Sequence, residues 1–273
     1  MTFQLVEPIL LIGLGGVGAR LTEKAKKSLN SDCLLISHDQ KDLTIENSIK
    51  ISAKSVVNPS THLIRGSALE TSDAIKKNIA NYSTVILMSN LAGKAGAGIG
   101  PIVSRICKQE QKNLLSFVVM PFKFEKERIF QSGIALKRIR QDSQCTIVVD
   151  NDALLDSNPD LTQNQCYDIS NKAIESMIHS LKSSEISGDT NILSTGKAAS
   201  DIEVSLKDSL RMLYEDAPPN SIKRSMLYVY GTDNIPVGVL NTISNITGGT
   251  FDENSTHVEM SSEESKVVML SSI

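Results

Sequence analysis

Two glycine-rich stretches of the chain have the composition of phosphate-binding turns. The first is Gly13-Leu14-Gly15-Gly16-Val17-Gly18, which fits the spacing GxGxxG. The second, residues 91–101, reads LAGKAGAGIGP and contains one lysine and no hydroxyl residue. Glycine lets backbone amides approach phosphate oxygens, and the N-terminus of a following helix favours negative charge. Both stretches therefore predict binding of phosphate by backbone amides.

The first turn taken alone predicts a dinucleotide site. It lies between an apolar run at 8–13 and a helical pattern at 17–29, and Asp39 follows at the end of the next apolar run. This is the arrangement of the dinucleotide fingerprint and indicates an NAD-dependent oxidoreductase. Such an enzyme needs a catalytic acid or base in the second half of the chain, and no residue stands out for that role. A second interpretation is a turn that only lets strand and helix pack closely.

The second turn changes the order of these hypotheses. An ordinary dinucleotide fold does not need another glycine-rich turn between strand and helix, whereas two turns on neighbouring strands could enclose several phosphates. A triphosphate fits that arrangement better than a pyrophosphate. Walker-type loops are excluded because GxxxxGK[ST] occurs nowhere in the chain.

The elements that position these turns form an α/β pattern. Five apolar runs alternate with helical segments or loops, at 8–13, 33–37, 84–89, 114–122 and 145–152. We expect a parallel, doubly wound sheet, with ligands at the carboxyl ends of its strands.

The second half of the chain indicates a smaller α+β unit after a long helix. We expect a nucleotide-binding α/β domain over 1–160, a central helix over 161–186 and a C-terminal α+β domain over 187–273. The stretch 187–196 is rich in turn formers. The last two strands, STHVEM and SKVVMLSSI, are predicted to form a hairpin.

Composition excludes several classes of protein. The 273 residues are 40% hydrophobic and carry a net charge of −3 with both signs interspersed, so we expect no nucleic-acid partner. No apolar run is long enough for a transmembrane segment, and a cytoplasmic location is expected. The four cysteines are far apart without a CxxC pair, which indicates buried thiols in a reducing compartment and no metal site.

The order of these features resembles the tubulin/FtsZ family. Residues 92–101 stand where that family has GGGTGTGAAP, Pro121–Glu125 reads PFKFE where it has PFxFE, and Asp150-Asn151-Asp152 precedes the long helix. The match runs over most of residues 8–182. Residues 244–249, SNITGG, also resemble the C-terminal domain of the family.

The resemblance implies a binding site for GTP or GDP, with Mg²⁺ possible. Glu125 and Arg128 would lie by the ribose, and Asn151 and Asn171 would approach the guanine, to which an asparagine amide can both donate and accept hydrogen bonds. With the phosphate-binding residues, the expected site is Gly13, Gly15, Gly16, Gly18, Asp39, Gly93, Lys94, Ala95, Gly96, Ala97, Gly98, Glu125, Arg128, Asn151 and Asn171.

Three departures from the family's pattern weaken the expectation of hydrolysis. Both threonines of the signature are alanine here, Ala95 and Ala97, and one glycine is Lys94. After the long helix, the NxDxxD motif of FtsZ-type relatives is missing, and Asp189 and Asp201 are the candidate acids in its place. No catalytic residue is therefore predicted, and whether the chain is an enzyme stays open.

These observations together predict an FtsZ/tubulin-like protein of the cytoskeleton or of cell division. We expect it to bind guanine nucleotide with weak or absent GTP hydrolysis. It would form a homo-oligomer or filament by head-to-tail contact, or bind a heterotypic partner. The alternatives are the NAD-dependent oxidoreductase and a nucleotide-free scaffold or regulator in which Lys94 fills the phosphate site.

Overall fold

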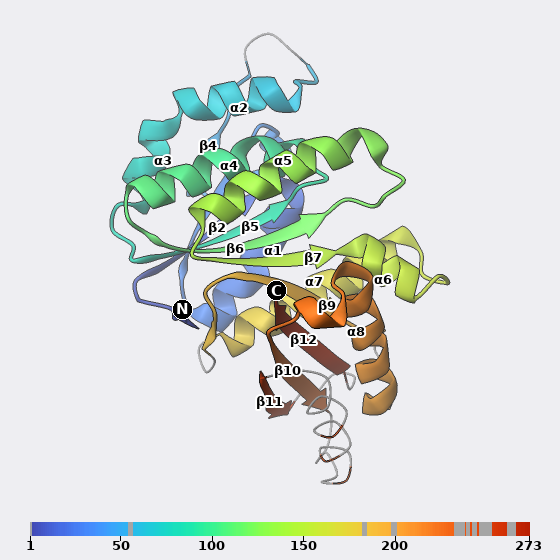
Figure 1. Cartoon of the computed structure of the whole chain (residues 1–273). Helices are drawn as coiled ribbons and strands as arrows, with labels where there is room; N and C mark the ends of the chain where they lie inside the picture. Colours follow the sequence, from blue (N-terminus) through green and yellow to red (C-terminus); the bar gives the residue numbers. More distant parts are fainter. Residues whose placement is uncertain are drawn as a thin grey trace. The chain divides into compact units, whose positions relative to one another are not determined.

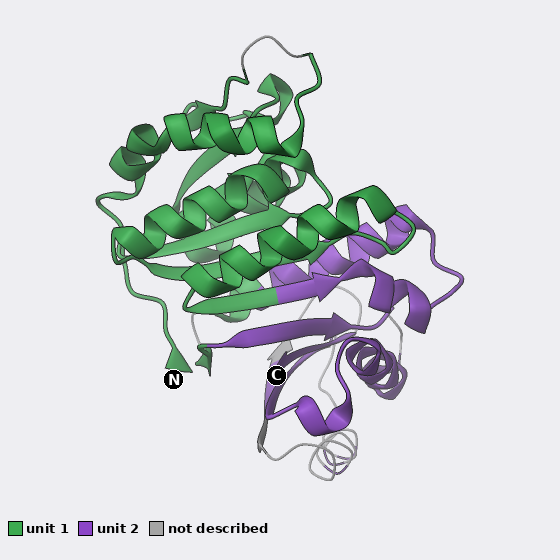
Figure 2. Cartoon of the chain, turned by 45° about the horizontal axis from the view of Figure 1, so that its top comes forward, with its two compact units in different colours: residues 1–147, 178–188 green, residues 148–177, 189–273 purple. Residues whose placement is uncertain are grey.

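The computed structural model describes residues 2–53, 57–181, 185–197, 201–231, 253–260 and 266–273, together with single positions at 238, 241 and 245. These residues form two compact units (Figure 2). Unit 1 consists of residues 1–147 and 178–188, and unit 2 of residues 148–177 and 189–273.

Unit 1 is built on a parallel β-sheet. The strands run in the order β6, β5, β2, β3, β4, and each pairs in parallel with its neighbour. Their bounds are β2 Ile9–Leu14, β3 Asp32–Ser37, β4 Ser48–Lys50, β5 Thr84–Asn90 and β6 Asn113–Met120, and β7 Cys145–Asp150 begins beside β6. The predicted parallel α/β sheet is confirmed.

Helices cover both faces of this sheet (Figure 1). Helix α1 packs on β2, β3 and β5, while α4 and α5 cover the opposite face and α2 and α3 pack on α4. Strand β1 pairs with β8 in a short antiparallel ladder. The bounds are β1 Thr2–Phe3, α1 Gly15–Leu29, η1 Gln40–Asp42, α2 Thr61–Glu70, α3 Ser72–Ile79, α4 Lys94–Gln109, α5 Lys126–Asp142 and β8 Ile186–Ser187.

The core of unit 1 explains why the strands read as unbroken apolar runs. Ile12, Leu34 and Leu87 are fully buried between the two helical layers. Burial of one such side chain contributes about 1.5–3 kcal/mol. All four cysteines are free and buried, and burial raises the pKa of the Cys107 thiol to about 12.

Helix α4 contains a proline whose missing hydrogen bond is replaced by a side chain. Pro101 lies inside the helix and has no N–H for the carbonyl oxygen of Ala97, four residues earlier. Arg65 of α2 donates from Nη2 to that oxygen at 3.0 Å. The guanidinium therefore satisfies the acceptor that the proline leaves unpaired and ties α2 to α4.

Replacing this arginine tests that account. We expect Arg65→Met to lower the free energy of unfolding by about 1–3 kcal/mol, because a buried carbonyl oxygen loses its donor. Chemical denaturation measures the change. Arg105→Met, at an exposed position on α4, is the control and should change stability by less than about 0.5 kcal/mol. Equal effects of the two substitutions would contradict the role given to Arg65.

Unit 2 combines helices with a mixed four-stranded arrangement. Its strands lie in the order β9, β12, β10, β11, with the first two pairs antiparallel and the last parallel. Helix α8 packs on β9 and β12 and on α6. The bounds are α6 Asn151–Ser157, α7 Gln163–Ser180, β9 Thr190–Thr195, α8 Ile202–Asp216, η2 Pro219–Ser221, β10 Arg224–Gly231, β11 Glu253–Met260 and β12 Lys266–Ser272.

Two predictions for this half of the chain were wrong. The expected hairpin of the last two strands does not form, because β10 lies between β11 and β12 and pairs with both. The stretch taken for turn formers contains β9, whose six residues are all buried. Residues 244–249, apart from position 245, lie outside the described part of the chain.

Candidate functional site

The first glycine turn begins helix α1 directly at the end of β2. Leu14 is the N-cap residue, and no side chain caps the helix. Gly15 has a φ of +65°, in the left-handed region that an L-amino acid side chain disfavours. The turn thus directs the N-terminus of α1 toward the carboxyl end of the sheet, and no described side chain caps the helix by a hydrogen bond.

The second glycine turn begins helix α4 in the same way at the end of β5. Gly93 is the N-cap residue, without a side-chain cap. The amides of Ala92 and Gly93 donate to Asn90, and the amide of Ala97 donates to Gly93. In the contacts of the described residues, the amides of Lys94, Ala95 and Gly96 have no acceptor. Three donors at the N-terminus of a helix are the groups that bind an anion.

The two turns lie side by side. A Cβ built on Gly15 would lie 3.0 Å from the Cβ of Ala95. The first turns of α1 and α4 therefore approach each other closely, as expected from the sequence, and their amides can act on one bound group.

The glycines of the two turns have different structural roles. Three of them allow another stretch of backbone to lie close to the turn. A Cβ on Gly13 would lie 2.6 Å from Gly18 O, and one on Gly18 would lie 2.6 Å from Met88 O. A Cβ on Gly96 would lie 2.1 Å from Asn90 O. Gly98 gives room to Ile64 of α2. At Gly93 a Cβ would lie 3.3 Å from Asn90 O, whereas at Gly15 and Gly16 it would meet only side chains, those of Ala95, Asp42 and Arg20.

The side chain of Lys94 is hydrogen-bonded to the segment before α2. Its Nζ donates to Oδ1 of Asn58, in the segment before α2, at 2.6 Å. Ala95 and Ala97, which replace the two threonines, are buried. The ammonium group of Lys94 is therefore directed to Asn58.

The acidic loop after β3 brings a different residue to the first turn from the one expected. Asp39 caps the short helix η1 by accepting a hydrogen bond from the amide of Lys41 at 3.0 Å. Asp42, three residues on, accepts a hydrogen bond from Ser37 at 2.6 Å, and its Oδ1 would lie 2.8 Å from a Cβ on Gly16. Sequence reasoning missed Asp42. The signal was a second acid one helical turn after Asp39.

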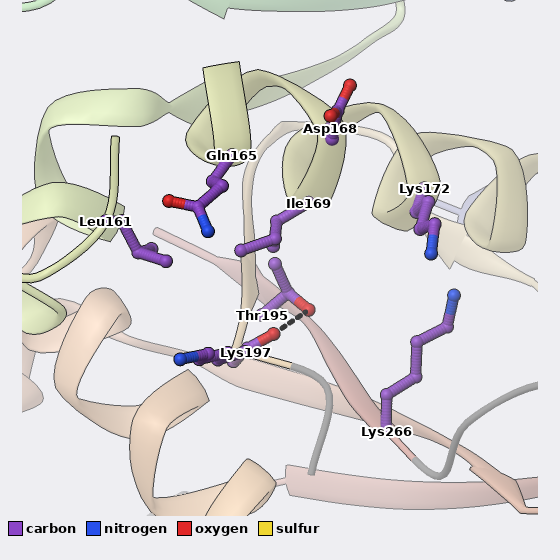
Figure 3. A pocket seen from close by; sticks show the side chains of 9 residues that line it. Leu161, Gln165, Asp168, Ile169, Lys172, Thr195, Lys197 and Lys266 are labelled. Carbon is purple, nitrogen blue, oxygen red and sulfur yellow. Dashed lines mark hydrogen bonds between the residues drawn. The ribbon is translucent and has the colours of Figure 1, made fainter. Parts of the chain in front are cut away.

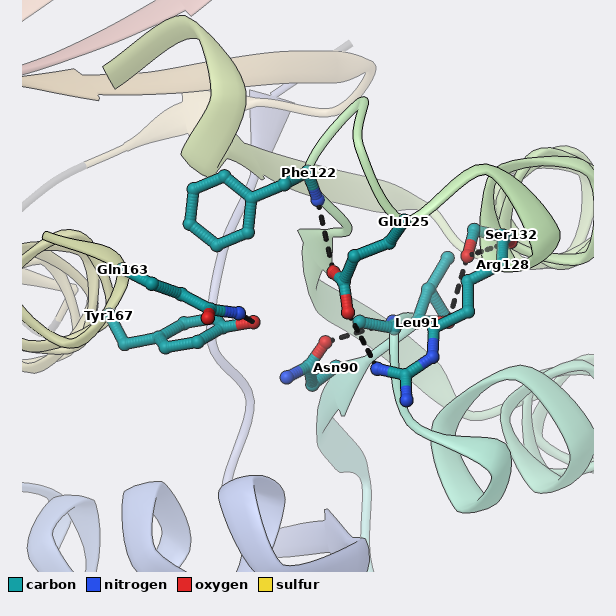
Figure 4. Close-up of polar contacts among 9 residues, drawn as sticks. Asn90, Leu91, Phe122, Glu125, Arg128, Ser132, Gln163 and Tyr167 are labelled. Carbon is teal, nitrogen blue, oxygen red and sulfur yellow. Dashed lines mark hydrogen bonds and ion pairs between the residues drawn. The ribbon is translucent and has the colours of Figure 1, made fainter. Parts of the chain in front are cut away.

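Glu125 and Arg128 are brought together at the start of α5 (Figure 4). The carboxylate of Glu125 accepts a hydrogen bond from the amide of Phe122 at 3.2 Å and pairs with Arg128 at 2.6 Å. Glu125 is mostly buried, with 12% of its side chain exposed, whereas Arg128 is 59% exposed. The acid thus stabilises its own turn and orients the arginine.

In unit 2, Asn151 has a buried donor without an acceptor. The side chain is fully buried, and its Oδ1 accepts a hydrogen bond from Ser170 of α7 at 2.6 Å. Its Nδ2 has no partner among the described residues. Asn171 follows Ser170 on α7 and is half-buried. A buried amide with a free N–H is uncommon and fits a site that receives an acceptor from a ligand.

The buried carboxyl group of Asp150, next to Asn151, should make the free energy of unfolding depend on pH. Burial raises the pKa of Asp150, and the nearby Asp152 carboxylate raises it further. A raised folded-state pKa stabilises the protein at low pH, and this contribution disappears as the pH rises through it. We expect Asp150→Asn, which keeps the cap on α6, to raise the free energy of unfolding at pH 7 by about 1 kcal/mol, with no gain near pH 3. Denaturation at both pH values measures this, and Asp160→Asn, at an exposed position, is the control.

The two candidate acids after α7 cap local backbone. Asp189 accepts a hydrogen bond from the amide of Thr190, and Asp201 caps α8 through the amide of Glu203, both at 2.8 Å. Among the described residues, no three acids, histidines or cysteines gather as a metal site. None of the described helices could cross a membrane.

Comparison with known sequences identifies relatives of the chain. The model of the GTPase domain of the Tubulin/FtsZ family matches residues 59–159. Cell division protein FtsZ 2 of Halobacterium salinarum is 25% identical over 178 residues, which are 61% of this chain and 44% of that protein. FtsZ of Aquifex aeolicus is 24% identical over 202 residues, which are 68% of this chain and 52% of that protein. The chain spans about half the length of the curated relatives it matches.

Solved structures show the same fold over nearly the whole chain. An FtsZ dimer of M. jannaschii, described as empty, superimposes with a TM-score of 0.76 and 16% identity, over 96% of this chain and 87% of that one. CetZ of Methanosaeta thermophila gives a TM-score of 0.71 and 17% identity, over 97% and 86% of the two chains. The comparisons of sequence and of structure thus agree: residues 59–159 match the GTPase-domain model of the Tubulin/FtsZ family, and the chain is similar to FtsZ proteins in sequence and in fold.

Proposed function

We propose that this chain binds a guanine nucleotide at the paired N-termini of α1 and α4 and self-associates in a cytoskeletal or cell-division role, with weak or absent GTP hydrolysis. The observation that carries the proposal is the close approach of the two turns, where a Cβ on Gly15 would lie 3.0 Å from that of Ala95. The comparisons do not favour the oxidoreductase alternative.

The residues present fit a polyphosphate. The amides of Lys94, Ala95 and Gly96 are available as donors, and two helix N-termini favour negative charge at one place. The bond between Lys94 and Asn58 argues against the scaffold alternative, in which the lysine fills the phosphate site. Asp42 beside Gly16 would repel a phosphate unless a cation such as Mg²⁺ lay between them.

The base and the hydrolysis step are proposed on separate grounds. By resemblance to the family, Asn151 and Asn171 approach the guanine, and the free Nδ2 of Asn151 supports a hydrogen bond to a carbonyl oxygen of the base. Weak hydrolysis follows from the missing threonines and from Asp189 and Asp201, whose carboxylates cap backbone amides. A water without a positioning acid reacts several powers of ten more slowly.

A thermal-shift panel tests nucleotide binding. The chain is heated with GTP, GDP, ATP or NAD, each with and without Mg²⁺. We expect GTP and GDP to raise the midpoint, because a ligand that binds only the folded state stabilises it. A shift with NAD alone supports the oxidoreductase, and no shift with any ligand supports the nucleotide-free scaffold.

Sedimentation tests self-association. Two of the structural relatives are named as an FtsZ dimer and as TubZ of a Clostridium botulinum phage. We expect pelleted protein to increase with concentration and with GTP. A chain that stays monomeric at high concentration, with and without GTP, contradicts the proposed assembly.

Replacing Lys94 tests whether its side chain assists phosphate binding or competes with it, because the two cases change the affinity for GTP in opposite directions. If its ammonium group adds charge beside the phosphates, Lys94→Gln should weaken GTP binding about tenfold, the scale of one hydrogen bond to a charged group. Asn58→Ala keeps the charge and should change binding less than threefold. Isothermal titration measures both. Tighter binding by Lys94→Gln would mean that the lysine competes with phosphate.

A further inference from the structure

Unit 2 contains a pocket that is separate from the glycine turns. It has a volume of about 240 Å³ and lies between α7, the end of β9 and the start of β12 (Figure 3). Pockets for drug-sized ligands begin at about 300 Å³, so this one suits a smaller molecule than a nucleotide.

Lysines dominate the charge of the pocket. Lys172 of α7, Lys197 after β9 and Lys266 of β12 all line it. Figure 3 shows the side chains of Lys172 and Lys266 pointing toward one another across the opening. Asp168 is the one acid among the lining residues, and its carboxylate is directed away from that pair. An anion placed between two ammonium groups is attracted by both of them.

The lysine side chains of the pocket are placed so that they can bind an anion. The Nζ of Lys266 lies 5.3 Å from the centre of the Tyr230 ring, a contact that orients the side chain. Lys172 and Lys197 have no carboxylate within ion-pair distance in the part of the chain described here. Their charges are therefore available to a ligand.

The remaining walls are apolar. Leu161 is buried, with 8% of its surface exposed, and Ile169 of α7 is half-buried. Thr195, at the floor, directs its hydroxyl to the carbonyl oxygens of Gly196 and Val267, at 3.4 and 3.3 Å. The threonine thus presents its methyl rather than a free hydroxyl, and the pocket combines an apolar interior with a cationic edge.

We propose that this pocket binds a small amphipathic anion, with a phosphate or carboxylate group between Lys172 and Lys266 and an apolar body against Leu161 and Ile169. All residues that line the pocket belong to unit 2, and none of them is a residue of the proposed nucleotide site. The volume fits one ring with its charged group.

Isothermal titration of the full chain with phenyl phosphate and benzoate tests the proposal at constant ionic strength. We expect saturable binding of at least one of the two, and the preferred one identifies the oxyanion. Lys172→Gln and Lys266→Gln should each weaken binding at least tenfold. Lys207→Gln, an exposed lysine of α8 that lies outside the pocket, is the matched control and should change binding less than twofold.

Three results would overturn the proposal. Binding of benzyl alcohol as tight as that of phenyl phosphate would show an apolar cavity without anion recognition. Equal binding of inorganic phosphate, or equal losses in Lys207→Gln, would show only surface charge. Displacement by GTP would place the probe in the glycine turns. The lysine variants should keep the GTP-dependent thermal shift, so that failure of this site and failure of the nucleotide proposal are distinguishable.

Discussion

Gly96→Ala is expected to lower the free energy of unfolding by about 3 kcal/mol, the upper end of the cost of overpacking a core. A Cβ at this position would lie 2.1 Å from Asn90 O and 2.7 Å from its carbonyl carbon. Both are backbone atoms of the strand end that leads into the turn, so no side-chain rotation relieves the clash. The helix has to move off β5, and the buried contacts of α4 are lost with it.

Two other glycines of unit 1 provide matched controls. Gly133 lies inside α5 with nothing within 4 Å of an added methyl, so Gly133→Ala should gain about 0.5–1 kcal/mol from the greater helix propensity of alanine. Gly98→Ala meets Ile64 Cγ2 at 3.0 Å and should fall between the two. Urea denaturation followed by circular dichroism gives the order of stability. If Gly96→Ala proves as stable as Gly133→Ala, the close packing of the turn on β5 is wrong.

This series of variants distinguishes two structural roles of glycine that the sequence alone could not distinguish. GxGxxG and the second glycine turn predict an approach of backbone to something, but the pattern is the same for a phosphate and for a neighbouring strand. Gly18 faces Met88 O and Gly96 faces Asn90 O, whereas Gly15 faces the methyl of Ala95 across the two turns. Which role each glycine has depends on the element that lies next to it in the fold, and the local sequence does not specify that neighbour.

The parallel strands were predictable because their signal is local. Strands β2, β3, β5 and β6 are buried on both faces and read as unbroken apolar runs of the length of one strand. Helices α2 and α3 were not predicted. The hydrophobic signal of α2 is weak because just two of its residues, Ile64 and Ala68, are buried.

The errors at the C-terminal end have a different cause. Strands β11 and β12 are close in sequence, which favours a hairpin, yet both pair with β10. Pairing partners of a strand depend on contacts distant in sequence, and period-two patterns do not specify them. Asp42 escaped notice for a similar reason. Its position beside Gly16 results from the short helix η1, which turns the chain back after Asp39.

Gly15→Ala should remove most of the GTP-dependent thermal shift and weaken nucleotide binding about 100-fold, the equivalent of losing two hydrogen bonds to charged groups. The residue has a φ of +65°, where alanine is strained by about 1–2 kcal/mol. Its methyl would also lie 3.0 Å from the Cβ of Ala95 and push apart the two helix N-termini whose amides bind the phosphates in our proposal. Gly66→Ala, inside α2 with open space around it, should leave binding unchanged.

A double-mutant cycle identifies the physical cause of this loss. Ala95→Gly removes the other methyl of the contact and by itself should alter binding less than threefold. In the Gly15→Ala, Ala95→Gly double variant the clash is gone but the backbone strain remains, so we expect about a tenfold recovery relative to Gly15→Ala. Titration of GTP into the four proteins measures the coupling between the two positions. A phosphate bound by both turns requires the two turns to keep their present separation. If the effects of the two substitutions on GTP binding are additive, α1 and α4 do not act on the same ligand.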